Sequence, residues 1–283
     1  DRFIIYNPFR YSDTSITSKL KCMNSMAARA SFGKHTWIRD SRQAWYQDLT
    51  GFIELLQKGN TSIIFQTGIE FIADPNNDIR FNPTAIFWEE GFLFTQKLSN
   101  SFFQAGYYHR CKHDIDNLDT GYGRVLIYGS MMAKWIFPIS LGSIIKDKSL
   151  VAVRADLYTI RQDHRYPEDL SVNKKNLKQL LGTTGISLNL NDSNKEKIII
   201  PYFHGFSLLH LYSKHEGFMD RFSAINTINF DGGFSSGITI RGAFDFRLGI
   251  RYEYLSDTNI EIDPQGAHLF SIVIEVLHSD YIR

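Results

Sequence analysis

Hydrophobic and polar residues alternate along the chain from Ile238 to Tyr254. Because successive side chains of a β-strand point to opposite sides of the sheet, a period of two predicts a strand, here over 235–255. Strands of globular proteins usually have about five or six residues, whereas about 9–11 tilted residues cross a bilayer. One face of this stretch is apolar, and the other carries Arg241, Asp245, Arg247, Arg251 and Glu253.

The same two-faced pattern recurs in other segments and predicts an all-β, antiparallel transmembrane β-barrel, whose outer face meets lipid and whose inner face meets water. Alternation and turn residues give about twelve strands, an even number as in bacterial single-chain barrels. Nothing interrupts the series, so we expect a single barrel domain over residues 1–283. The predicted strands are 14–32, 43–58, 61–74, 78–95, 100–113, 122–137, 149–163, 174–190, 196–213, 219–230, 235–255 and 266–282.

The connections between these segments alternate in length, as expected for short periplasmic turns and longer outer loops. If the first strand runs outward, short turns fall near Gly59, Asn100, Asp192 and Gly232. Two connections depart from the rule, because 73–78 is short for an outer loop and 138–149 is long for a periplasmic turn. The other expected outer loops are 33–42, 111–122, 161–174, 213–219 and 255–268.

A soluble sandwich or barrel is the alternative, since its strands also alternate but turn their apolar face inward. A strand as long as 235–255 is hard to place in it. The composition is compatible with both, with 22% charged residues and a mean hydropathy of -0.22. It excludes a helical membrane protein, which needs runs of about 18 apolar residues, but not a barrel, in which only alternate residues are apolar.

The net charge and the first residues of the sequence indicate the location of the protein and the partners it can bind. The formal net charge of +1 and the absence of a basic stripe exclude a typical nucleic-acid binder. The first residues show no signal-peptide pattern. We therefore expect the mature form of a protein of the bacterial outer membrane, after removal of a signal peptide. Cys22 and Cys111 fall on strands far apart around the barrel, so no disulfide is expected between them.

The charged residues on the polar faces are expected to point into the lumen and to form ion pairs there. A twelve-stranded barrel is narrow, so such side chains can occlude it. This argues against a general porin, while a narrow selective channel stays an alternative. The predicted lumen charges are Glu54, Glu70, Arg80, Arg154, Asp156, Arg241, Asp245, Arg247, Arg251 and Glu253.

The segment 105–117 concentrates a nucleophile, a base and acids, and its alternation places His109 and Cys111 on the lipid-facing side. The sequence 106–111 (GYYHRC), followed by 124–128 (RVLIY) and Trp135, resembles the active-site strand pair of outer-membrane phospholipase A, a twelve-stranded barrel. The resemblance implies that His109 is a base and that Cys111 is a nucleophile in place of the family's serine. The family's orienting asparagine falls here at about Gly123.

Carboxylates follow this segment directly. Asp114, Asp116 and Asp119, with loop carbonyls, offer the oxygen ligands that Ca²⁺ prefers, and the resemblance also implies calcium. Their spacing matches no EF-hand loop, and a solvated acidic loop is the alternative. Apart from calcium, no cofactor is expected.

Three functional hypotheses follow. The first is a non-enzymatic structural or accessory barrel that binds outer-membrane lipids or a protein partner through its rim and loops. The second is an outer-leaflet lipid acyl hydrolase that uses His109 and Cys111, which requires a third polar group near His109 on the lipid face. The third is a narrow channel, which requires a continuous wet lumen.

Overall fold

Twelve antiparallel strands account for most of the residues that the structure, a computed structural model, describes. These residues are 19–36, 44–74, 76, 82–114, 123–141, 145–166, 179–191, 197–215, 222, 224–242, 244–256 and 267–278. The strands are β1 (Lys21–Thr36), β2 (Trp45–Lys58), β3 (Thr61–Asp74), β4 (Asn82–Lys97), β5 (Phe102–Asp114), β6 (Gly123–Leu141), β7 (Ile145–Tyr166), β8 (Leu180–Asn191), β9 (Ile199–Ser213), β10 (Ile225–Ile240), β11 (Phe244–Leu255) and β12 (Ala267–His278).

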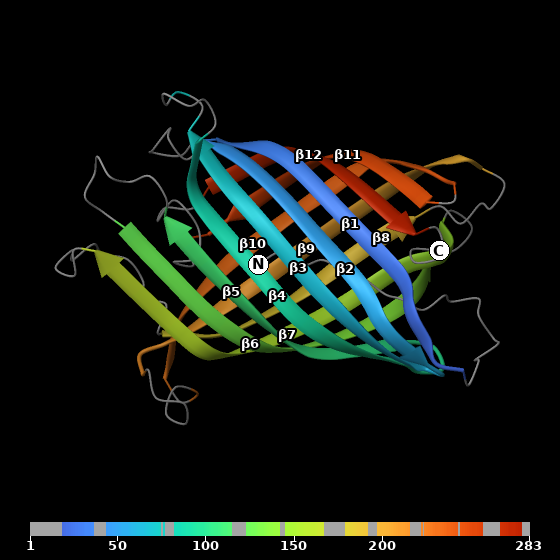
Figure 1. The fold of residues 1–283 in the computed structure, drawn as a ribbon, viewed down its shortest axis with the longest axis horizontal. Coiled ribbons are helices and arrows are strands. Elements are labelled where there is room, and N and C mark those ends of the chain that lie inside the picture. The colour runs from blue at the N-terminus through green and yellow to red at the C-terminus, as the bar shows by residue number, and fades with distance from the viewer. Residues whose placement is uncertain are drawn as a thin grey trace.

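Each strand pairs with its neighbours in the sequence, and β1 pairs with β12, so the sheet closes into one barrel of tilted strands (Figure 1). Closure satisfies the backbone groups of every strand edge, which a lipid environment requires. The predicted all-β, antiparallel barrel of about twelve strands is confirmed. No helix in the described part of the chain is long and apolar enough to span a membrane.

Apolar side chains face outward and charged ones face inward, as β11 illustrates. Phe244 is 51% and Leu248 is 42% exposed, whereas Arg247 and Arg251 on the alternate face are 6% and 5% exposed. A soluble barrel would show the opposite arrangement. The barrel is therefore of the outer-membrane type, with a lipid-facing belt that includes Leu49, Phe92, Phe94, Met131, Trp135, Val153, Ile160, Ile186, Phe230, Ile238, Ile250, Phe270 and Ile272.

The expected turn at Gly232 is wrong. β10 continues through Gly232 to Ile240 and the β10–β11 connection is 241–243. Because three residues separate Ile240 from Phe244, even-numbered residues face outward on both β10 and β11. The alternation in the sequence is therefore continuous across the turn and resembles that of a single strand. Gly232 instead pairs with Tyr254 on β11 and Ser207 on β9, inside the sheet.

The segment 138–149 is not a long turn either. β6 runs to Leu141 and β7 begins at Ile145, so three residues connect them, in keeping with the short connections at this end of the barrel. The β2–β3 turn at Gly59 agrees with the prediction, and Gly59 has a φ of 58°, a left-handed conformation that suits glycine. Cys22 on β1 and Cys111 on β5 are free thiols.

Candidate functional site

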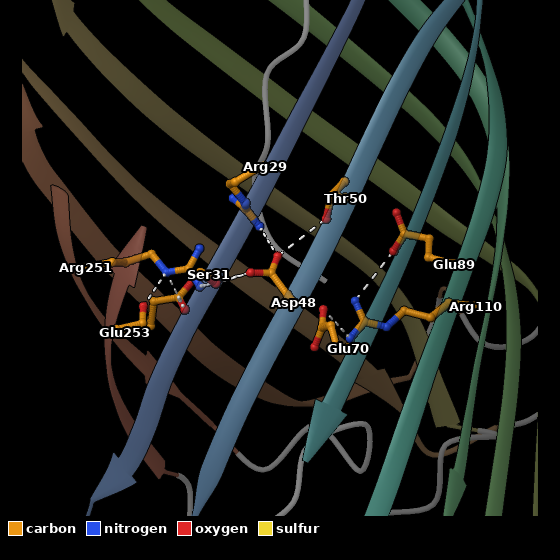
Figure 2. Close-up of polar contacts among 10 residues, drawn as sticks. Arg29, Ser31, Asp48, Thr50, Glu70, Glu89, Arg110, Arg251 and Glu253 are labelled. Atoms are coloured by element: carbon orange, nitrogen blue, oxygen red, sulfur yellow. Dashed lines mark hydrogen bonds and ion pairs between the residues drawn. The ribbon is translucent and has the colours of Figure 1, made fainter. Parts of the chain in front are cut away.

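Polar side chains of β1 and β2 meet at Asp48 on the inner wall. The Asp48 carboxylate accepts hydrogen bonds from Arg29 at 2.8 Å, from the Ser31 hydroxyl, and from Thr50 at 3.4 Å (Figure 2). Asp48 is 4% exposed, so this charge is removed from bulk water and depends on these donors.

Arg251 links β11 to the same cluster across the closing strands. Its guanidinium donates to Ser31 at 2.8 Å and to Ser271 at 3.2 Å. It also lies 3.1 Å from Glu253 and 3.9 Å from Asp48 (Figure 2). Two arginines and two carboxylates thus balance one another inside the barrel, over β11, β12, β1 and β2.

A second inner cluster is centred on Arg110 of β5. Its guanidinium lies 3.0 Å from Glu70 on β3 and 3.5 Å from Glu89 on β4 (Figure 2). Gln66 also donates to Glu89, at 3.1 Å. Of these residues, only Glu70 stands among the predicted lumen charges, although the alternation that turns His109 outward also places Arg110 on the lumen side. Arg110, like Arg29 and Asp48, carries the same signal, since each stands on the polar face of its strand.

Arg154 and Asp156 of β7 form an ion pair at 2.6 Å on one inner face, as residues two apart on a strand can. Arg154 also donates to the Tyr108 hydroxyl at 3.2 Å and lies over its ring at 5.6 Å. Tyr128 packs edge-to-face between Tyr108 and Tyr158, with centroid distances of 6.4 and 5.4 Å. The three phenol rings, each 1% exposed or less, thereby place bulky side chains on this part of the inner wall.

A chain of hydrogen bonds crosses three strands beside this ring cluster. The Thr183 hydroxyl lies 2.8 Å from His210 Nδ1, and His210 Nε2 lies 3.0 Å from Asp231. Asp231 also accepts from Ser256 through its backbone N–H at 2.7 Å and its hydroxyl at 2.5 Å. A hydroxyl, an imidazole and a carboxylate joined in this order by hydrogen bonds form the catalytic triad of some hydrolases. Here Thr183 is 2% exposed, so a substrate has no access, and the arrangement satisfies buried polar groups.

The other predicted lumen charges take different positions. Arg247 pairs with Glu275 at 3.3 Å and lies over the Tyr202 ring at 4.8 Å. Glu54 is fully buried and accepts from Ser25 and Ser62, and Asp245 is 4% exposed on the inner face. Arg241 lies in the β10–β11 turn rather than on a strand, because β10 ends at Ile240. Arg80 lies outside the described residues, so its place in the lumen stays a prediction.

These side chains leave little free space in the lumen. Inward-facing residues on several strands, such as Gln104, Lys134, Ser187 and Thr239, are less than 5% exposed, although water in an open lumen would count as exposure. An interior cavity beside Arg29, His204 and Arg251 has a volume of about 20 Å³, the space of about one water molecule.

On the outer wall, two ionisable groups lie close together among apolar neighbours. Glu90 on β4 and His109 on β5 are register partners, and Glu90 Oε1 lies 3.5 Å from His109 Nδ1. Their side chains are 55% and 36% exposed on the lipid-facing side. Cys111 follows on the same face, about 7 Å along the strand. A thiol, an imidazole and a carboxylate therefore share this face.

The neighbouring strand β6 supplies no orienting side chain to this group. The residue of β6 that pairs with His109 is Gly129. The strand register therefore contradicts the inference that Gly123 stands beside His109. The Tyr107 hydroxyl occupies the space beside Gly129, where a Cβ would lie 2.0 Å from it. The polar group beside His109 and Cys111 is instead Glu90, on β4, which pairs with β5 on the side away from β6. The sequence contained its signal, since Ile86, Trp88, Glu90, Phe92 and Phe94 alternate on one face.

The calcium prediction lies largely outside the described residues, which include neither Asp116 nor Asp119 nor the side chain of Asp114. Among the side chains that are described, no three of the His, Cys, Asp and Glu residues gather closely enough to hold a metal ion.

No protein-family model matches the chain, and no curated protein sequence matches it. Among solved structures, the chain is similar to LpxR from Salmonella typhimurium, with a TM-score of 0.47 and 8% identity over 89% of this chain and 99% of that one. The translocator domain of autotransporter NalP from Neisseria meningitidis gives 0.45 and 10% over 93% and 90%. Salmonella typhi OmpF gives 0.33 and 7% over 91% and 98%. Similarity at this level concerns the barrel architecture and carries no conclusion about activity.

Proposed function

We propose that the protein is a structural or accessory barrel of the bacterial outer membrane that contacts lipid or a protein partner through its outer wall and rim, with a lumen that does not conduct. One observation carries this proposal. The charges of the inner wall, including Asp48, Arg251 and Glu253, are buried in mutual ion pairs rather than hydrated. A channel needs a continuous water path, and these side chains occupy its place.

Conductance in a planar lipid bilayer tests the proposal. We expect no stable current steps from the purified wild-type barrel. The double substitution Asp48→Ala and Arg251→Ala removes two buried charged side chains from the inner wall and is expected to produce measurable steps. Glu90→Gln, on the outer wall, serves as the control and should stay silent. Stable steps from the wild-type protein would contradict the proposal.

A second candidate, an outer-leaflet acyl hydrolase, is favoured by the Glu90–His109 contact. In this mechanism His109 removes the thiol proton of Cys111, and the thiolate attacks an ester carbonyl to form a thioester. The protonated His109 returns the proton to the leaving lysolipid alcohol, and water then hydrolyses the thioester. Glu90 holds the imidazole in orientation and stabilises its charged form, as the carboxylate of a catalytic triad does.

Fatty-acid release from phospholipid, assayed in detergent with Ca²⁺, tests this candidate. We expect Cys111→Ala and His109→Ala to abolish release, and Glu90→Gln to reduce it by about a hundredfold or more, in keeping with loss of an orienting carboxylate. Cys22→Ala is the matched control for the second thiol and should leave release unchanged. If the wild-type protein releases no fatty acid, or if neither Cys111→Ala nor His109→Ala affects release, this candidate is removed.

A further inference from the structure

The outer wall has a groove of about 500 Å³ over the strands that close the barrel. Its lining comes from five adjacent strands in the order β2, β1, β12, β11 and β10. The volume falls within the roughly 300–1,000 Å³ of ligand-binding pockets. The side chains that shape it are Phe32, Trp45, Phe234, Ile250, Tyr252 and Phe270.

Strand register places the larger side chains of the groove in one transverse row. Lys34 on β1 pairs with Trp45 on one side and with Phe270 on the other. Phe270 pairs with Tyr252, which pairs in turn with Phe234. The rings of Phe270 and Tyr252 are 5.0 Å apart, and those of Tyr252 and Phe234 are 5.7 Å apart. This row forms one end of the groove, toward the end of the barrel opposite the short turns such as that at Gly59, which the sequence assigns to the outside.

Two walls enclose the groove on either side of β12. Phe32 and Trp45 stack at 5.0 Å on the β1–β2 side, while Tyr252 and Ile250 stand on the β11 side. These side chains stand on the lipid-facing side of the barrel. The occupant of such a groove must therefore be apolar.

The outer end of the groove is polar. Lys34 is exposed there, two residues before the end of β1, and it lines the groove. No carboxylate among the described residues forms an ion pair with Lys34. In the same row, the Tyr252 hydroxyl lies 2.7 Å from Nδ1 of His268, which stands one row further out near the start of β12. Cationic and amphipathic aromatic side chains at this level lie beside the headgroups of the outer leaflet.

We propose that this groove binds one acyl chain of a phosphate-bearing lipid of the outer leaflet, and that the Lys34 ammonium contacts the lipid phosphate. An apolar slot that ends in a single cation complements an acyl chain that ends in an anionic headgroup. This inference rests on the proposed function only in assigning the contacts of the protein to its outer wall.

Native mass spectrometry of the barrel in detergent micelles tests the inference, with dimyristoylphosphatidylglycerol and dimyristoylglycerol as the two probes. Lys34→Gln is expected to weaken phosphatidylglycerol binding by roughly tenfold, the effect of losing one charge-assisted hydrogen bond, and to leave diacylglycerol binding unchanged. Ile250→Trp fills the groove and should weaken both lipids, because Ile250 is 68% exposed within the lining.

Matched controls separate the groove from the rest of the wall. Lys58→Gln removes a lysine at the other end of the barrel, and Ile160→Trp adds a ring on β7, so both should bind as the wild type does. Heat-modifiable gel mobility confirms that each variant is folded. Equal retention of phosphatidylglycerol by wild type and Ile250→Trp would overturn the proposal. So would a dimer that Ile250→Trp dissociates, since a second copy would then occupy the groove. Either result leaves the conductance test unaffected.

Discussion

Glu90 Oε1 lies 3.5 Å from His109 Nδ1 on the lipid-facing side of the barrel, with both side chains partly exposed among apolar neighbours. A carboxylate in this position is unfavourable in a membrane, and ionisable residues that face the bilayer commonly have a function. Its neighbour in the sequence, Glu89, lies on the opposite face and belongs to the inner cluster of Arg110. The two glutamates therefore allow a direct comparison of the outer and inner surfaces.

Neutralising these two glutamates is expected to change stability in opposite directions. Glu90→Gln removes a charge from the lipid face and should raise the free energy of unfolding by about 1 kcal/mol. Glu89→Gln weakens contacts with Arg110 and Gln66 and should lower it by about 1–2 kcal/mol. Urea unfolding of the barrel in lipid vesicles measures both. The same sign for the two variants would contradict the assignment of faces.

Asp48→Asn is expected to destabilise the barrel by about 3 kcal/mol, because it removes one partner from a buried ion pair. Arg29 and Arg251 would then share an inner wall with less compensating charge. The double substitution Asp48→Asn and Arg29→Gln should cost less than the sum of the single ones, because the two residues interact directly. Additive costs in the same unfolding assay would show that the contact contributes nothing.

Gly237→Ala is expected to impair folding, because β10 and β11 approach closely at a pair of glycines. A Cβ at Gly237 would lie 2.1 Å from the Leu248 carbonyl oxygen and 2.5 Å from Gly249 Cα, which are backbone atoms. At Gly51 the nearest such atom is 3.9 Å away, so Gly51→Ala is the matched control. Folding yield by heat-modifiable mobility compares the two. Equal yields would show that the strands can separate at Gly237 without cost.

A short epitope inserted after Gly242 is expected to be tolerated, because it extends the connection between β10 and β11. The same epitope after Gly232 should prevent assembly, because Gly232 is paired on both sides within the sheet. Protease protection in intact cells adds a test of direction, since 241–243 lies at the end assigned to the periplasm. If the variant with the insertion after Gly232 assembles, Gly232 lies in a turn, as the sequence predicted, and not within the sheet.

Strand identity and facing follow from the sequence because each face meets a different medium, lipid outside and packed polar groups inside. Strand ends do not follow in the same way. A three-residue turn such as 241–243 keeps the alternation in phase, and an Asp-Gly-Gly sequence such as 231–233 has turn residues without a turn. Gly233 is required there for packing, since a Cβ would lie 2.6 Å from the Tyr252 carbonyl oxygen.

The partners of each side chain depend on strand register, which the alternation does not fix. The sequence places His109 and Cys111 on the outer face, but only register brings Glu90 beside His109 and Gly129 to its other side. The outer groove depends on the closure of β1 with β12, which joins residues from opposite ends of the chain. Such long-range pairing is not encoded in any local pattern.

Arg251 and Ser31 are 220 residues apart in the chain, and their hydrogen bond forms only after the first and last strands have met. Contacts of this kind form late in folding, because closing the long loop between their residues costs chain entropy before the contact can stabilise the structure. They are therefore expected to be weak or absent in the folding transition state. Weakening them should then leave the folding rate nearly unchanged and accelerate unfolding, by about tenfold for each 1.4 kcal/mol lost. The lumen cluster would thereby determine how long an assembled molecule lasts rather than how fast it assembles.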